Sequence, residues 1–211
     1  MKLNNKKIKD EKVKKSLKRN IKLGAIIILP IIIIGLIIML RHNVTLTNDE
    51  IIQRVKNLDR YNTIVEFTIN NSRGEYVEKV NLHYSKGHAP MMEFGDKLVK
   101  TYNKDSISMK YKDGKEYNLE KDTDSFYILA ILEELFKNPI TSIEEGSEEW
   151  GDIKYLKVSI DIVSNNQHLD KAVIYINKTE KIPMLMKIQD INNKDRVKIE
   201  YRDFSKIDKC K

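Results

Sequence analysis

The chain has 211 residues, of which 41% are hydrophobic and 33% charged, a balance that suits one folded domain and excludes a disordered chain. Its formal net charge of +7 is concentrated at one end, because residues 1–22 hold ten Lys and Arg against two acidic residues. That stretch carries +8, which leaves −1 for the rest of the chain. Nucleic-acid binding needs a basic face on the folded domain itself, so we expect no nucleic-acid partner.

The first element along the chain is an apolar run at residues 23–40, LGAIIILPIIIIGLIIML, which has no polar side chain. As a helix it would span about 27 Å, close to the roughly 30 Å of a hydrocarbon core, so it predicts a transmembrane helix. A cleaved signal peptide is the alternative. That class has a shorter apolar core followed by small residues, whereas here Leu40 is followed by Arg41 and by no lipobox cysteine, which favours an uncleaved anchor.

The charges on either side of this run predict its orientation. Ten basic residues precede it and Arg41 stands nearly alone after it, so the N-terminus should stay in the cytoplasm. We therefore expect a single-pass protein of the cell membrane. Its parts are a basic cytoplasmic tail (1–22), a transmembrane helix (23–40), a linker (41–45), an extracytoplasmic domain (46–205) and a C-terminal tail (206–211).

A short amphipathic helix should open the extracytoplasmic domain. The segment Thr47-Asn48-Asp49-Glu50 has the spacing of a capping box, in which the threonine and glutamate side chains bind free N–H groups at a helix start. Ile51, Val55 and Leu58 follow at helical spacing. The pattern predicts a helix of about three turns.

After this helix the apolar period changes to two, which is typical of strands with one buried face. Val65, Phe67 and Ile69 alternate with polar residues, and we expect them on an apolar concave face. Asp113-Gly114 is a strong hairpin signal. Further strands are expected around residues 80–84, 91–94, 98–102, 107–111 and 117–119.

One helix should interrupt these strands, beginning at Asp122 or Thr123 and ending at Asn138-Pro139. Its apolar side chains form a broad surface that must be covered, either within a core or over a cavity, and we favour the core. The residues expected to cover the concave face are Phe126, Leu129, Leu132 and Phe136.

After the helix, the carboxylates of Glu144-Glu145 and Glu148-Glu149 indicate a solvated polar loop that ends at Trp150. Trp150 is the only tryptophan, and it suits a partner contact about as well as strand-edge packing. Residues 155–201 then read as an antiparallel meander of alternating strands with one face in solvent.

Within this meander, residues 173–204, VIYINKTEKIPMLMKIQDINNKDRVKIEYRDF, resemble a repeated phrase of the lipoprotein-carrier (LolA-like) superfamily. The phrase is a strand, a D/N-K-T-x-x-x-P turn, a strand, a D-x-x-x-K turn and a strand ending in Y-x-D-F. The resemblance covers residues 46–205 and implies an α+β fold, a curved antiparallel half-barrel that stays unclosed. A helical lid should cover its concave apolar face.

A compact, membrane-tethered chain of this kind is also similar to the GerS-like germination proteins, lipoproteins that use the fold to bind a spore-cortex amidase. This chain departs from them because it lacks a lipobox cysteine, and the apolar run at 23–40 would serve as the tether instead.

No catalytic constellation is visible. His42, His83, His88 and His168 are scattered, and no recognised metal spacing joins them. Cys210 is the only cysteine, so an internal disulfide is excluded, and the thiol is either unpaired or bonded between chains. We therefore expect a protein that is not an enzyme and has no cofactor, catalytic residue or metal site.

The function expected from these features is binding. The first hypothesis is a membrane-anchored protein that docks a cell-envelope partner, with a spore-cortex or peptidoglycan amidase as the implied partner in sporulation or germination. Open sheet edges would also permit a homodimer. The alternative is a carrier that shelters lipid or lipoprotein acyl chains in the concave face, although a permanent anchor argues against a shuttle.

Overall fold

The computed structural model describes residues 33–34, 46–71, 73–147, 151–164 and 166–207. Contacts divide the chain into two units, Met1–Leu46 and Thr47–Lys211, and only the second is described at length. Apart from residues 33–34, the expected transmembrane run lies outside the described residues, as do the basic tail and linker. Within the described ranges, none of the helices is both long enough and apolar enough to cross a bilayer.

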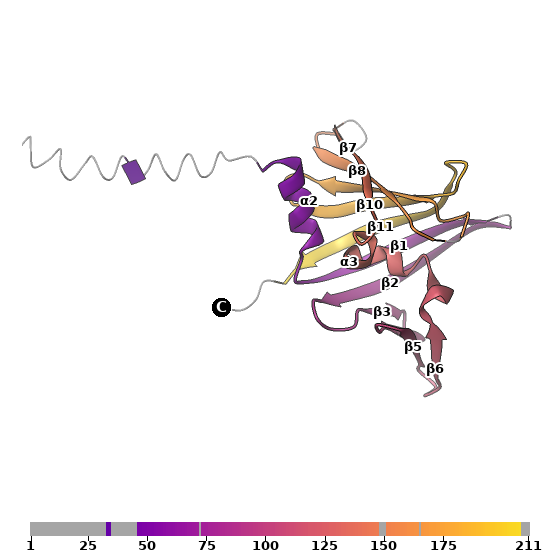
Figure 1. Cartoon of the computed structure of the whole chain (residues 1–211). Helices are drawn as coiled ribbons and strands as arrows, with labels where there is room; N and C mark the ends of the chain where they lie inside the picture. Colours follow the sequence, from indigo (N-terminus) through magenta and orange to yellow (C-terminus); the bar gives the residue numbers. More distant parts are fainter. Residues whose placement is uncertain (1–32, 35–45, 72, 148–150, 165, 208–211) are drawn as a thin grey trace, which may run out of the picture. The chain divides into compact units, whose positions relative to one another are not determined.

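The described residues of the second unit form one open sheet of eleven antiparallel strands (Figure 1). Its order is β6-β5-β4-β3-β2-β1-β11-β10-β9-β8-β7, so two meanders meet where β1 pairs with β11. The strands are β1 (Arg60–Asn71), β2 (Gly74–Ser85), β3 (Met91–Phe94), β4 (Leu98–Tyr102), β5 (Ser106–Tyr111), β6 (Glu116–Glu120), β7 (Ile140–Gly146), β8 (Tyr155–Asp161), β9 (Lys171–Asn177), β10 (Ile182–Gln189) and β11 (Asp195–Lys206).

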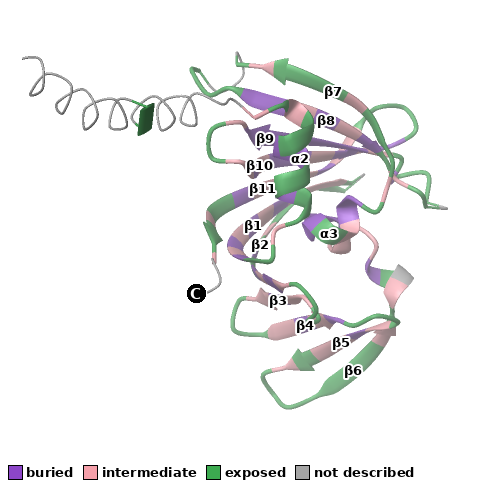
Figure 2. Cartoon of the chain, turned by 60° about the vertical axis from the view of Figure 1, so that its left-hand side comes forward, coloured by how far each residue is buried: buried purple, intermediate pink, exposed green. Residues whose placement is uncertain are grey.

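The protein is therefore mostly β, and the sheet is the open antiparallel one that the LolA-like resemblance implied. It curves around its helices, so we call the side that holds them the concave face (Figure 2). Alternation places every second side chain there: Tyr61, Val65 and Phe67 of β1 are fully buried.

Helix α2 (Asn48–Lys56) begins as the sequence predicted. The Glu50 N–H donates to Thr47 Oγ1 at 3.3 Å, and the Thr47 N–H donates to Glu50 Oε2 at 2.8 Å, which completes a capping box. The apolar side of the helix is buried through Ile51, Ile52 and Val55. α2 and the shorter α3 lie on the same face of the sheet (Figure 2).

The prediction of a single helix between residues 122 and 138 is wrong. The segment, which we call the lid segment (residues 121–136), forms two 3-10 turns, η1 (Lys121–Asp124) and η2 (Ile128–Ala130), and a one-turn helix, α3 (Leu132–Leu135). Ile131 is extended (φ −80°, ψ 113°) and separates the last two. Thr123 is no helix cap, because its hydroxyl donates to the Glu120 carbonyl at 2.6 Å.

The interruption at Ile131 is stabilised from the sheet. The Leu132 N–H donates to the Tyr61 hydroxyl at 3.1 Å, and the Tyr201 hydroxyl donates to the Ala130 carbonyl at 3.1 Å. These buried hydroxyls replace the hydrogen bonds that a continuous helix would have made. The helix also ends earlier than expected, at Leu135, and Asn138 Nδ2 donates to the carbonyl of that residue at 3.1 Å.

Two further expectations need correction. Glu144 and Glu145 lie in edge strand β7, not in a loop, and they pair with Lys157 (3.2 Å) and Lys178 (2.6 Å). The face of the meander that was expected to meet solvent is also partly buried, because β9 is buried on both faces. On the face opposite the concave one, β9 contributes Val173 and Tyr175 to a second apolar cluster, which also contains Tyr155 and Leu185.

Candidate functional site

The concave face beneath the lid segment is filled by the protein's own side chains. Among the residues expected there, Val65 and Phe67 are fully buried and Ile69 is half-buried near the end of β1. From the lid segment, Leu129, Leu132 and Phe136 are buried and Phe126 is half-buried. The structure brings these residues together as core, and Phe126 lies edge-on to Phe67 with ring centroids 6.2 Å apart.

A buried ion pair fastens the start of the lid segment to β4. Lys100 Nζ lies 2.8 Å from Asp124 Oδ2, and the Tyr102 hydroxyl donates to the same oxygen at 2.9 Å. The Lys100 ammonium also lies over the rings of Phe94 and Tyr127, at 4.7 and 4.4 Å from their centroids. Burial, followed by the charge of Asp124, raises the pKa of Tyr102, so this hydroxyl keeps its proton.

Tyr127 extends the attachment to β1, β2 and β3. Its ring lies edge-on to Phe67 at 4.8 Å and to Phe94 at 5.2 Å, and its hydroxyl donates to Glu78 Oε2. Burial and this hydrogen bond raise the pKa of Tyr127. The lid segment is thus held at several points, and it covers the middle of the concave face.

Beyond the lid segment lies the part of the sheet that we call the distal arm (β3–β6). In Figure 2 the arm curves away from α2 and α3, and much of β6 is exposed. A hollow of about 610 Å³ lies on the arm. Its lining residues are Met109, Tyr111, Asp113, Lys115, Tyr117, Asn118 and Leu119.

The apolar members of this lining share the concave face. Met109 pairs directly with Tyr117 across β5 and β6, and Ile107 pairs with Leu119, so these four side chains point to one side. Ile107 is fully buried, whereas Tyr117 is 52% exposed. The Tyr117 ring lies edge-on to Tyr111 with centroids 5.8 Å apart. Along β5 and β6, the apolar side chains therefore change from buried at Ile107 to exposed at Tyr117.

The opposite face of the same two strands is polar. Lys110 pairs with Glu116 at 2.9 Å, and Ser108 lies opposite Asn118. β6 ends the sheet, so one row of its backbone N–H and C=O groups faces none of the other strands that the structure describes. The arm therefore presents an apolar surface directly beside an open strand edge, an arrangement that suits the addition of a strand from another chain.

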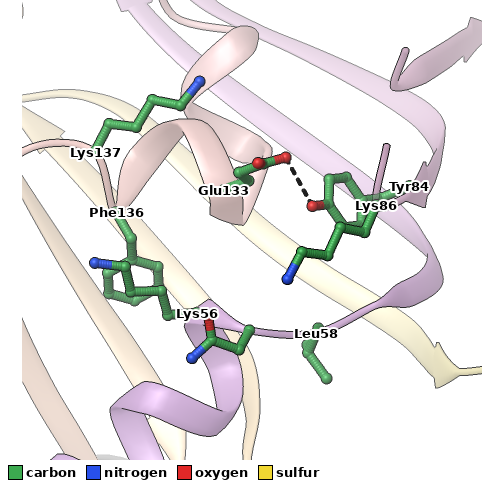
Figure 3. Close-up of a pocket in the computed structure, with 8 residues that line it drawn as sticks. Lys56, Leu58, Tyr84, Lys86, Glu133, Phe136 and Lys137 are labelled. Atoms are coloured by element: carbon green, nitrogen blue, oxygen red, sulfur yellow. Dashed lines mark hydrogen bonds between the residues drawn. The ribbon is translucent and has the colours of Figure 1, made fainter. Parts of the chain in front are cut away.

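A second hollow, of about 360 Å³, lies between the end of α2, the end of β2 and α3 (Figure 3). Lys56, Lys86 and Lys137 are among its lining residues, and the Tyr84 hydroxyl donates to Glu133 Oε2 at 2.7 Å within it. Burial and this bond raise the pKa of Tyr84. In Figure 3, Lys137 points away from the hollow, and its amine pairs with Glu134 at 2.6 Å.

The charge of this second hollow is partly accounted for by the fold. α2 ends here, so its last carbonyl groups place partial negative charge beside Lys56, which lies in the final turn. Glu133 adds a carboxylate to the lining. We therefore assign no anion to the hollow and take the distal arm as the candidate binding surface.

The remaining sequence candidates give no site within the described ranges. No group of three or more His, Cys, Asp or Glu in those ranges could hold a metal ion. His83 lies between Asn62 (3.1 Å) and Glu93 (3.6 Å) on the polar side of the sheet. Trp150 and Cys210 lie outside the described residues, so their expected roles stay predictions.

The chain was compared with protein families, with curated sequences and with solved structures. Residues 21–211 match the family model described as "Sporulation protein YdcC-like". No curated protein sequence matches the chain. Among solved structures, an uncharacterized conserved protein from Thermus thermophilus is similar with a TM-score of 0.50 and 11% identity, over 77% of this chain and 88% of that chain.

Two further solved structures are similar at lower TM-scores. One is a chain of the complex between the CwlD amidase from Clostridioides difficile and the GerS lipoprotein, with a TM-score of 0.43 and 18% identity over 76% of this chain and 96% of that one. The other is the LolA superfamily protein NE2245 from Nitrosomonas europaea, with a TM-score of 0.42 and 7% identity over 77% and 94%. At such identities the likeness concerns the fold alone.

Proposed function

We propose, from the premise that this chain belongs to the YdcC-like sporulation protein family, that it is a membrane-anchored docking protein of the cell envelope. In this proposal residues 23–40 anchor it, the sheet unit lies outside the membrane, and the distal arm binds a protein partner. The protein acts by binding, without catalysis. A peptidoglycan amidase is the narrower form of the proposed partner, as the GerS-like resemblance implied.

The observation that carries the proposal is the change from covered to open apolar surface along β5 and β6. An exposed hollow that contains Met109, Tyr111, Tyr117 and Leu119 leaves apolar area in water, and such a surface is commonly an interaction site. It also adjoins the open edge of β6, which offers hydrogen bonds to a partner backbone.

The carrier alternative is less well supported by the same face. An acyl chain would need space beneath the lid segment. That space is occupied by buried side chains, Phe67 from β1 and Leu129 and Leu132 from the lid segment. The ion pair between Lys100 and Asp124 also ties the lid segment down. A ligand would have to displace these contacts before it could enter.

A crosslinking experiment tests the docking proposal. The full chain is expressed in sporulating cells of its own source, crosslinked in place, and compared with a variant in which Met109→Ser and Tyr117→Ser remove the paired apolar side chains of the arm. The proposal expects a specific crosslink to an envelope protein, reduced at least about tenfold in the variant, which corresponds to about 1.4 kcal/mol.

The matched control is Ile69→Ser with Tyr76→Ser, another directly paired apolar couple near the tip of β1 and β2. It removes similar surface elsewhere, so the crosslink should persist. Equal crosslinking by wild type and arm variant would refute the proposal. Lipid that stays bound to the purified full chain through detergent washing, identified by mass spectrometry, would favour the carrier instead.

A further inference from the structure

We infer that the edge of β6 recognises an extended segment of its partner in which basic and apolar residues alternate. This inference rests on the proposed docking function and names the chemistry of the docked strand. The five residues of β6 read Glu116, Tyr117, Asn118, Leu119, Glu120, so the two faces of the edge differ sharply. A strand that pairs with β6 must match both faces at once.

The concave side of the edge is apolar. Tyr117 and Leu119 point there, because each pairs directly with an apolar residue of β5, Met109 and Ile107 respectively. The hollow of about 610 Å³ lies on this side. A partner strand would therefore place apolar side chains opposite Tyr117 and Leu119, where they would leave water.

The other side of the edge is acidic. Glu116 and Glu120 lie at its two ends, both exposed, with Asn118 between them. Glu116 already pairs with Lys110 of β5 at 2.9 Å. A basic residue on the next strand would continue this row of alternating charge, since opposite charges that face each other across strands are stabilising.

The same pattern disfavours a second copy of this chain as the occupant. If two β6 strands paired antiparallel about Asn118, Glu116 of each would face Glu120 of the other, and like charges directly opposite are destabilising. The charge of the edge therefore selects a basic strand over its own copy. The second copy becomes an outcome that the test can reveal.

The test uses two synthetic peptides and the full chain in neutral detergent. One peptide carries the core Lys-Val-Thr-Val-Lys, which would place Lys opposite both glutamates, and the other carries Glu-Val-Thr-Val-Glu. Binding is followed by fluorescence anisotropy, and strand pairing by hydrogen exchange at the β6 amides. The lysine peptide should bind at least about tenfold more tightly than the glutamate peptide and slow exchange in β6.

The decisive variant is Glu116→Lys with Glu120→Lys, which should reverse the order of the two peptides. The matched control is Glu75→Lys with Glu180→Lys, which makes the same charge change at exposed residues outside β6 and should keep the original order. If both variants reversed the order of the two peptides, the order would reflect the net charge of the protein alone, and the inference would be overturned. Binding without slower exchange in β6, or dimerisation of the chain without peptide, would overturn it too.

The two proposals fail separately. If neither peptide protects β6 while the Met109→Ser, Tyr117→Ser variant still loses its crosslink, the docking function stands and strand addition is wrong. If the lysine peptide binds as described and no envelope protein is crosslinked, the strand chemistry stands and the docking function is wrong.

Discussion

Lys100 and Asp124 form an ion pair inside the protein, with Nζ and Oδ2 2.8 Å apart and both side chains at or below 10% exposure. Lys100 comes from β4, the second strand of the distal arm, and Asp124 ends η1. One contact therefore holds the lid segment at the boundary between the covered core and the open hollow. Removal of either partner would leave the other charge buried without its counterpart.

We predict that Asp124→Ala destabilises the protein by about 3–5 kcal/mol, the usual cost of breaking a buried pair. The Lys100 ammonium would lose its carboxylate and the Tyr102 hydroxyl its acceptor. Urea denaturation of the full chain in neutral detergent measures the effect. Glu116→Ala breaks an exposed pair with Lys110 and serves as the control, for which the midpoint should stay unchanged. Similar midpoints for the two variants would contradict the prediction.

The hydroxyl of Tyr61 should stabilise the lid segment, because it accepts the hydrogen bond of the Leu132 N–H. Tyr61→Phe keeps the ring, which stacks on Tyr84 and Phe204, but leaves the buried Leu132 N–H without an acceptor. We predict a loss of about 1–3 kcal/mol and faster hydrogen exchange at Leu132. Tyr117→Phe removes an exposed hydroxyl and should change neither quantity. Unaltered exchange in Tyr61→Phe would mean that the break at Ile131 does not depend on this bond.

Alkaline pH should unfold the protein through its buried tyrosines. Burial raises the pKa of Tyr61 and of Tyr201 above the ordinary value near 10, so the folded state keeps their protons when the unfolded chain has lost them. The unfolded state then binds fewer protons, and stability falls as the pH rises above about 10, by up to about 1.4 kcal/mol per unit for each tyrosine. Below that pH these two groups cause no change.

Denaturation midpoints between pH 9 and pH 11 measure this dependence. Tyr201→Phe should lower stability at pH 8, since its bond to the Ala130 carbonyl is lost, yet flatten the decline above pH 10. A variant that declines as steeply as the wild type would show that other groups control alkaline unfolding.

Much of the fold follows from local pattern. The capping box at Thr47, the alternation of Val65 and Phe67, and the hairpin at Asp113-Gly114 each use residues that are near in sequence, and all three lie where the pattern placed them. The lid segment was predicted wrongly because its conformation depends on distant residues. Tyr61 and Tyr201 each lie 71 residues from the backbone group that they bind at the break.

The candidate site escaped prediction for a related reason. Met109, Tyr111, Tyr117 and Leu119 were expected in strands, but a strand pattern does not tell whether the lid segment covers them. Lys100 likewise stands at an apolar-facing position of β4, where alternation alone suggests a break in the core. Its partner Asp124 lies 24 residues away, and only the folded chain joins them. Edge strand β7 was missed because its glutamates suggested a loop.

The close approach of Gly146 and Tyr155 gives a final prediction. A Cβ built at Gly146 would overlap the Tyr155 hydroxyl oxygen and the ring carbon that bears it. Gly146→Ala must therefore displace the ring from the second apolar cluster, whose other members include Val173 and Tyr175. We predict a destabilisation of about 1–3 kcal/mol, as for other overpacked sites.

A double-mutant cycle separates this steric cause from a general cost of alanine in β7. In a Tyr155→Val background the ring is absent, so Gly146→Ala should become nearly neutral, with a coupling free energy of about 1–3 kcal/mol. Urea denaturation of the four chains supplies the cycle. If the losses of stability caused by Gly146→Ala and Tyr155→Val simply add, the clash between the new Cβ and the ring is not the cause of the Gly146→Ala effect. The cost would then come from the backbone at the end of β7, where Gly146 pairs with Tyr155.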